Sequence, residues 1–202
     1  YDSAFLEEGE ILALDQLEFE EKGMELVRDI FLFACYTGLS YIEIKLLNPN
    51  GIVSGIDGEL WIDVKRQKTK TEVKVPLLPK AKKILEKYVD FPKNENTVLP
   101  VYSNQKVNQY LKIIAQRANI DKHLTFHVAR HTFATTITLM NDVPIETVSK
   151  LLGHTKLSTT QKYARVVEKK ISKDMAQLKN ILDESSHKIQ DNSGVPNLRI
   201  VR

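Results

Sequence analysis

Four side chains in the second half of the 202-residue sequence combine a nucleophile with groups that bind phosphate. Tyr163 lies nine residues after His154 and 33 residues after Arg130, and His127 lies three residues before that arginine. A phenol can attack a phosphodiester, but its pKa of about 10 means that it needs help in losing its proton. A guanidinium offers a planar fork of donors to two phosphate oxygens. These residues predict phosphoryl transfer through a covalent phosphotyrosine, which conserves the bond energy and so needs neither ATP nor a metal cofactor.

The spacing of these residues indicates how they are positioned. His127 and Arg130 are three residues apart on a helix expected over residues 126–140, so both side chains project from one face. Gly153 comes directly before His154, and a glycine lets backbone and imidazole approach a bound phosphate closely. Taken alone, His127 and Arg130 fit a core histidine and a surface arginine. Their combination with the second histidine and the tyrosine favours an active site.

A metal site is the rival interpretation of the histidines. His127 and His131 are four residues apart, a spacing that can bind zinc, but the metalloprotease pattern requires glutamate where Val128 stands. Cys35 and His123 have no partner at ligand spacing. We therefore expect no metal site, and interpret His131 as a structural histidine that holds its helix in place.

The hydrophobic pattern predicts a mainly helical fold with a small antiparallel β-sheet, an α+β domain. Apolar residues alternate over 60–64 and again over 73–77, which is typical of a β-hairpin, here a lysine-rich one. A first helix is expected to start near Leu12, with Asp15 as its candidate cap. Further helices are predicted at residues 24–36, 41–47, 79–89, 104–117, 126–140, 145–152 and 167–182.

The motifs His127-Val128-Ala129-Arg130, Leu151-Leu152-Gly153-His154 and Tyr163 together resemble those of the tyrosine recombinases, the integrases of phages and mobile elements. The similarity runs from about residue 12 to residue 182. It implies the catalytic domain of a DNA breaking-rejoining enzyme. Such an enzyme cuts a strand through a 3′-phosphotyrosine and joins it to a new partner, and thereby integrates or excises a mobile element.

The resemblance also assigns roles to individual residues. The second histidine of the family, matched by His154, donates a hydrogen bond to the scissile phosphate. A lysine on a mobile β-hairpin is the general acid towards the leaving 5′-hydroxyl, and Lys68 in Lys68-Thr69-Lys70 matches it. The neighbouring cations Lys65, Arg66 and Lys70 leave that assignment less secure than the others.

The sequence departs from the family at one position. Arginine normally follows Thr-Gly-Leu as a second phosphate clamp, whereas Ser40 stands there in this chain. Losing such a donor costs ~10²–10³ in rate if nothing replaces it. A subgroup of integrases from conjugative and mobilisable elements resembles this chain in having Thr-Gly-Leu-Ser. Arg66 and Arg28 are candidate replacements, and we favour Arg66, because Arg28 lies about 18 Å from Ser40 along a straight helix.

The net charge of +3 identifies no partner, but its distribution is uneven. Residues 1–25 carry nine acids and one base, whereas residues 65–87 carry nine bases and two acids. This lysine-rich segment can offer one face to phosphates, and a solvated surface is the alternative. The resemblance implies double-stranded DNA as the partner, with Lys65, Lys70 and Lys74 as candidate contacts. The resemblance adds other protomers, in a synaptic tetramer, and accessory DNA-bending proteins.

The domain organisation expected is a catalytic domain over residues 1–182 and a flexible tail over 183–202 that docks onto a neighbouring protomer. The family's N-terminal core-binding domain is absent, so the chain is interpreted as a fragment of a longer integrase. One cysteine and no apolar run of 18 residues favour a cytoplasmic protein. The resemblance implies a bacterial protein that is associated with the nucleoid. Two alternatives remain: a DNA-binding module in which Ser40 has abolished cleavage, and a type IB topoisomerase, against which the compact domain and the integrase-like motifs argue.

Overall fold

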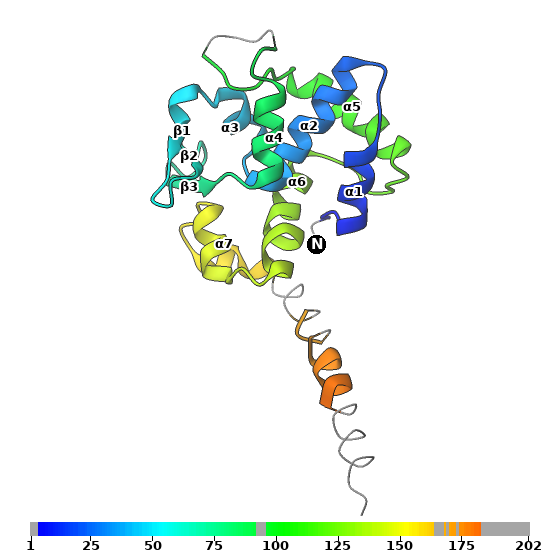
Figure 1. Cartoon of the computed structure of the whole chain (residues 1–202), viewed down its shortest axis with the longest axis vertical. Coiled ribbons are helices and arrows are strands. Elements are labelled where there is room, and N and C mark those ends of the chain that lie inside the picture. Colours follow the sequence, from blue (N-terminus) through cyan, green and yellow to red (C-terminus); the bar gives the residue numbers. More distant parts are fainter. Residues whose placement is uncertain (1–3, 92–95, 164–167, 169, 173, 183–202) are drawn as a thin grey trace, which may run out of the picture. The chain divides into compact units, whose positions relative to one another are not determined.

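The computed structural model describes residues 4–91, 96–163, 168, 170–172 and 174–182 of the chain. It divides into two units, Tyr1–Tyr163 and Ala164–Arg202, and the first carries all the predicted site residues. That unit is mainly helical, with one small antiparallel sheet among its described residues (Figure 1). The predicted α+β fold is therefore confirmed.

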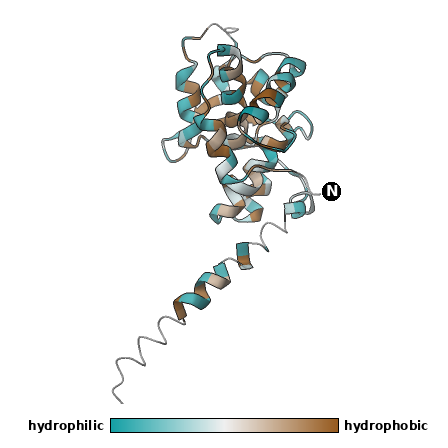
Figure 2. Cartoon of the chain, turned by 90° about the vertical axis from the view of Figure 1, so that its right-hand side faces the viewer, coloured by the Kyte–Doolittle hydropathy of each residue, from teal (hydrophilic) through white to brown (hydrophobic). Residues whose placement is uncertain are grey.

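Helix α2 (Lys22–Thr37) forms the centre of the first unit. Every residue from 26 to 35 is buried, which is typical of a helix packed on all sides. Its neighbours are α1 (Glu8–Gln16), α4 (Pro79–Lys87), α5 (Asn104–Arg117) and α6 (Phe126–Thr132). Figure 2 shows hydrophobic residues gathered between these helices and hydrophilic residues outside them. Burial of this apolar surface stabilises the unit and fixes the position of α2, including its C-terminal end.

The end of α2 is a glycine for two reasons. Gly38 has a φ of +67°, the left-handed conformation that closes many helices. A Cβ at this position would also lie 2.5 Å from the ring of Phe133. The carbonyl of Gly38 is thereby presented at a defined place beside α6.

The sheet has the order β1 (Ile52–Ser54), β2 (Leu60–Lys65), β3 (Glu72–Pro76), with both pairs antiparallel. The predicted hairpin is thus confirmed as β2 and β3, joined by a turn at residues 67–69, while β1 was not predicted. In Figure 1 the sheet lies beside α3 (Tyr41–Leu46), and the 3₁₀ turn η1 (Pro49–Gly51) leads from that helix into β1. The hairpin turn is exposed and carries Lys68.

The single helix predicted at 126–140 is interrupted in the structure. Helix α6 ends at Thr132, and the chain continues as a π-helix, η2 (Phe133–Thr138), and a 3₁₀ turn, η3 (Leu139–Asn141). The hydroxyl of Thr138 donates to the carbonyls of Phe133 and Ala134, at 2.9 and 2.8 Å. Such bonding from threonine to preceding carbonyls competes with the regular helical ladder. Helix α7 (Ile145–Leu151) follows.

The start of the chain also differs from the prediction. Helix α1 begins at Glu8, and its cap is formed by Glu7 and Glu10 rather than by Asp15. Asp15 instead lies near the end of the helix, where its carboxylate forms an ion pair with Lys80. The cap was assigned to the wrong residue because several acidic residues in this segment could cap a helix. The sequence does not show which of them bonds to the backbone at the helix start.

In the second unit, residues 168, 170–172 and 174–182 are helical, as predicted. The apolar side chains of Ile171, Met175 and Leu178 are exposed. The expected tail at 183–202 lies outside the described residues. No helix within the described residues has the length and apolar character needed to cross a membrane.

Candidate active site

Arg130 lies where the ends of two helices meet. From α6 its Nη1 donates to the carbonyl of Gly38 (2.6 Å) and its Nη2 to that of Leu152 (2.5 Å). These carbonyls terminate α2 and α7, where the helix dipole attracts a cation. Only two of the five guanidinium N–H groups are used in these bonds, so the others can face a phosphate. Burial, followed by the charge of Arg66, lowers the pKa of Arg130 to about 10, which leaves it a cation at neutral pH.

Arg66 lies beside Arg130 and shares one of its partners. Its Nη1 donates to Glu43 Oε2 (2.7 Å) and to the carbonyl of Gly38 (3.3 Å), and its Nη2 to the carbonyl of Leu151 (2.5 Å). The side chain is only 2% exposed, and its Nε is buried with no hydrogen-bond partner among the described residues. Gly38 thus joins the two guanidinium groups through a single oxygen.

Gly153 makes room for Arg66. It has a φ of +65°, and a Cβ there would lie 2.7 Å from the Cγ of Arg66. The sequence predicted that this glycine lets the backbone approach a bound phosphate. The structure adds a second role that the sequence did not indicate, the close packing of Arg66 against Gly153.

Ser40, at the position where the family has arginine, is the N-cap of α3. Its backbone N–H donates to Glu43 Oε2 (2.8 Å), and the serine side chain accepts from the third residue of the helix. Ser-x-x-Glu is the sequence signature of this capping box, so the pair could have been found from the sequence. Burial acts to raise the pKa of Glu43, but the charge of Arg66 and the bonds from Ser40 and Arg66 outweigh it and hold the pKa below its ordinary value.

The structure separates Arg28 from this cluster. Its Nε donates to Asp29 Oδ1 (2.7 Å), and its Nη1 donates to the carbonyls of Leu17 (2.5 Å) and Asp15 (3.3 Å). The guanidinium thus binds the end of α1 and does not share the carbonyls that hold Arg130. Of the two candidate replacements, only Arg66 is brought to Arg130.

Tyr163 closes the short 3₁₀ helix η5 (Gln161–Tyr163) and is 5% exposed. Its Oη lies 2.6 Å from Nδ1 of His131, a histidine that is 3% exposed. Burial, opposed in part by the charge of Arg130, raises the pKa of Tyr163 to about 12. His131, interpreted from the sequence as holding its helix in place, therefore contacts the predicted nucleophile itself.

The two predicted catalytic histidines have different surroundings. His127 is exposed, and its ring packs edge-on against that of His131 with centroids 4.5 Å apart. His154 is half-buried, and its Nδ1 lies 2.8 Å from the hydroxyl of Thr160. Burial and the charges of Arg130, Lys162 and Arg66 lower the pKa of His154 to about 4. His154 is thus neutral at pH 7. Partial burial of its ring, followed by the charges of Lys162, Arg130 and Lys68, lowers the pKa of His127 as well.

The hairpin turn approaches this group from the sheet. The hydroxyl of Thr69 donates to the carbonyl of Gly153 (3.3 Å), which brings the exposed Lys68 towards His127. Lys162 also belongs to the site, although the sequence did not single it out. Its Nζ lies 5.0 Å from the ring centre of Tyr163. Its position directly before the tyrosine is the signal that would have found it.

The candidate DNA-binding lysines lie on the same hairpin. Lys65 and Lys70 are exposed, and Lys74 forms an exposed ion pair with Asp63 (3.2 Å). The backbone N–H of Lys70 donates to the carbonyl of Arg66 (2.9 Å), but within the described residues no side-chain bond joins any of the three lysines to Arg66 or Arg130.

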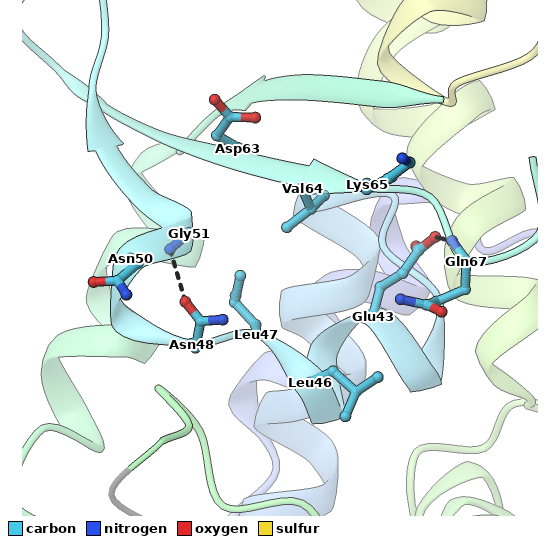
Figure 3. Close-up of a pocket in the computed structure, with 10 residues that line it drawn as sticks. All are labelled: Glu43, Leu46, Leu47, Asn48, Asn50, Gly51, Asp63, Val64, Lys65 and Gln67. Carbon is cyan, nitrogen blue, oxygen red and sulfur yellow. Dashed lines mark hydrogen bonds between the residues drawn. The ribbon is translucent and has the colours of Figure 1, made fainter. Parts of the chain in front are cut away.

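A pocket of about 370 Å³ opens between α3, η1 and β2 (Figure 3). Figure 3 shows the Glu43 carboxylate in its bond with the backbone of Gln67, and the other lining residues come from the end of α3, the segment that leads through η1, and β2. None of the predicted catalytic side chains lines it, so this pocket is not where the chemistry takes place. In the described residues, no three His, Cys, Asp or Glu side chains are grouped as a metal ion would require.

Most of the chain is similar to known proteins. Residues 6–170 match the Phage integrase family. The chain belongs to this family. A tyrosine recombinase of Thermosipho africanus (strain TCF52B) is 35% identical over 171 residues, which cover 81% of this chain and 58% of that protein. The tyrosine recombinase XerD of Staphylococcus saprophyticus subsp. saprophyticus is 42% identical over 71 residues, 35% of this chain and 24% of the relative. The chain therefore spans less than two thirds of the length of each of these relatives.

Solved structures show the same fold. The XerA recombinase superposes with a TM-score of 0.69 and 22% identity, covering 88% of this integrase chain and 65% of XerA. The XerH site-specific recombinase, bound to its palindromic difH substrate after cleavage, has a TM-score of 0.69 and 15% identity, covering 87% and 53%. The catalytic domain of bacteriophage HP1 integrase has a TM-score of 0.57 and 25% identity, covering 81% and 88%. The last comparison spans most of an isolated catalytic domain.

Proposed function

We propose that this chain is the catalytic domain of a site-specific recombinase that cleaves and rejoins DNA through a 3′-phosphotyrosine, and so integrates or excises a mobile element. The observation that carries the proposal is the grouping of Tyr163, Arg130, His127 and His154 around the ends of α6 and α7. In this scheme Tyr163 attacks the phosphorus, Arg130 and the two histidines bind the phosphate oxygens, and Lys68 protonates the leaving 5′-oxygen. The chemistry requires no cofactor.

Arg66 takes part of the role of the missing arginine. With 2% of its surface exposed it cannot reach DNA in this conformation, but it places positive charge beside Arg130 and holds Gly38 and Glu43 in position. Ser40 is then a helix cap rather than a damaged clamp. This arrangement supports a place among the Thr-Gly-Leu-Ser integrases of conjugative and mobilisable elements. The names of the relatives favour strand exchange over a type IB topoisomerase.

Covalent trapping tests the reaction. On a nicked suicide substrate the cut piece diffuses away, so rejoining fails and the enzyme stays attached. We expect a DNA–protein adduct that resists denaturant and maps to Tyr163, and we expect Tyr163→Phe to bind DNA without forming it. Binding without any adduct in the unaltered protein would favour the alternative of a DNA-binding module. An adduct in the phenylalanine variant would show that another residue is the nucleophile.

Double-stranded DNA is the proposed partner of the hairpin lysines. Lys65, Lys70 and the exposed Lys74 would neutralise backbone phosphates, so affinity should fall steeply with salt. Each change to alanine should reduce the slope of log affinity against log salt by about one ion. A flat dependence in the unaltered chain would leave these lysines as a solvated surface. Two further parts belong to the proposal. Accessory DNA-bending proteins would assist the reaction, and the protein would act in the bacterial cytoplasm, at the nucleoid.

Contacts between protomers are proposed for the C-terminal part. Ile171, Met175 and Leu178 form an exposed apolar stripe on the helix of the second unit, which needs a partner surface. In this proposal, residues 183–202 tether a segment that docks onto the next protomer of a synaptic tetramer. The boundary between catalytic domain and tail, at residue 182, is part of the same proposal. Deleting 183–202 from the full-length protein should leave cleavage of a single suicide site intact and weaken synapsis. Unchanged synapsis would assign the tail no role in assembly.

A further inference from the structure

His131 contacts the oxygen at which the proposed reaction takes place. Its Nδ1 lies 2.6 Å from the Oη of Tyr163, and the two rings meet at 64° with centroids 5.5 Å apart. The two side chains are 3% and 5% exposed. Because both are shielded from water, each satisfies the polar group of the other. The phenol therefore has an imidazole rather than solvent as its hydrogen-bond partner.

The protonation states of the pair are determined by their surroundings. Burial first, and then the nearby positive charges, lower the pKa of His131 to about 3, whereas burial raises the pKa of Tyr163 to about 12. At neutral pH the imidazole is neutral and the phenol keeps its proton, so the hydroxyl donates and Nδ1 accepts. The titratable and charged groups that face His131 are His127 and Arg130 from α6, Lys162 from η5 and His154 from the segment after α7.

We propose that His131 positions Tyr163 and accepts its proton during DNA cleavage. The inference rests on the function proposed above. In cleavage the phenolic proton passes to Nδ1, the bond from Oη to phosphorus forms, and the bond from phosphorus to the 5′-oxygen breaks. The 5′-oxygen takes its proton from Lys68. In rejoining, the 5′-hydroxyl attacks phosphorus and returns its proton to Lys68, while the imidazolium returns its own to Oη.

Bound DNA makes this transfer easier than it is in the free protein. Burial, followed by the positive charges nearby, holds the pKa of His131 low, but a phosphate bound at Arg130 and His127 brings negative charge close to these groups. A nearby anion favours the protonated imidazole, and negative charge increases further in the transition state. His127, which is exposed, can meet that phosphate, while the buried His131 meets the nucleophile.

The test is single-turnover cleavage of the suicide substrate by the full chain, measured from about pH 6 to about pH 9. His131→Leu removes the acceptor, His131→Asn keeps an acceptor that cannot take a full proton, and His123→Asn changes an exposed histidine as control. We expect His131→Leu to cleave about 10²–10⁴-fold more slowly at neutral pH. Its deficit should shrink by about tenfold per pH unit, because hydroxide then removes the phenolic proton.

A second readout separates proton transfer from structural support. A fluorinated tyrosine at position 163 has a more acidic phenol, and should rescue His131→Leu more than it accelerates the unaltered enzyme. His131→Asn should recover part of the rate at fixed pH but keep the pH slope, and it carries the test if the leucine variant does not fold. A deficit that is independent of pH and not rescued, or an unchanged rate, would overturn the proposal. If the unaltered chain forms no adduct at all, the proposed function itself fails.

Discussion

The two arginines, Arg66 and Arg130, and the proposed nucleophile, Tyr163, are anchored by different kinds of contact. Arg66 and Arg130 make hydrogen bonds to the carbonyls of Gly38, Leu151 and Leu152, and Arg66 adds a buried ion pair with Glu43. Three of these partners are backbone carbonyls at the ends of α2 and α7, and the fourth is the buried carboxylate of Glu43.

Tyr163, on the 3₁₀ helix η5, and His154, in the segment after α7, are held by one side-chain bond each, to His131 and to Thr160. The electrostatic part of the site is therefore preorganised before DNA binds. The part that carries the nucleophile can shift when two hydrogen bonds break. A recombinase gains from this difference, because its phosphate clamp must stay in place while its tyrosine attacks and is later released.

The largest effect is expected at the clamp. Arg130→Ala should slow cleavage by about 10³-fold or more, since the guanidinium acts on charge that develops in the transition state. DNA affinity should change little, because one phosphate contact among many contributes little to binding. Adduct formation and a binding titration measure the two effects separately. Equal losses in both would show that Arg130 holds DNA rather than stabilises the transition state.

The hairpin lysine is the next test. Lys68→Ala should slow cleavage by about 10²-fold if it protonates the leaving oxygen. In a substrate with a 5′-bridging sulfur, the leaving group is a thiolate, which needs little protonation. The cleavage rate of Lys68→Ala should therefore recover on this substrate. Lys70→Ala, two residues along the same turn, serves as the control and should behave alike on both substrates. If the sulfur substrate does not restore cleavage by Lys68→Ala, Lys68 contacts a phosphate rather than protonating the leaving oxygen.

The buried ion pair predicts how stability depends on pH. Glu43→Gln should lower the free energy of unfolding by about 3–5 kcal/mol at neutral pH, because Arg66 is left buried and unpaired. The pKa of Glu43 in the folded protein is below the ordinary carboxyl value, so its contribution is present above that value and lost as pH falls through the folded pKa. Urea unfolding from about pH 7 to about pH 3 should show the two proteins converging. A difference that stays constant would contradict the assignment.

The smallest effect concerns the glycine that admits Arg66. Gly153→Ala should lower the free energy of unfolding by about 1–3 kcal/mol, through the left-handed backbone and through the contact with Cγ of Arg66. Gly58→Ala is the matched control, because Gly58 has a φ of +78° but nothing lies within 4 Å of an added Cβ. The first change should cost more stability and also slow cleavage. Equal costs would mean that strain alone matters and that Arg66 adapts.

Some features of the fold were predictable from the sequence, and others depended on contacts that the sequence does not mark. The hairpin and the helices around His127 and Arg130 were predictable because their apolar residues repeat at the period of the element. The break of the predicted helix at Thr132 was not, since it depends on threonine hydroxyls competing with the backbone. The placement of Arg28 was also not predictable, because its partners lie in α1 and none of them is marked by a motif.

By itself the sequence determined the family, the fold class and the residue types that could perform the chemistry, because motif spacing and hydrophobic period are local properties of the chain. The sequence favoured Arg66 over Arg28, but tertiary structure decided how Arg66 is held beside Arg130, since Gly38, Arg66 and Leu151 meet only when the ends of α2, β2 and α7 pack together. It also decided that His131 faces Tyr163. Those two residues are 32 positions apart, and only the packing of η5 against α6 brings a phenol and an imidazole within hydrogen-bond distance.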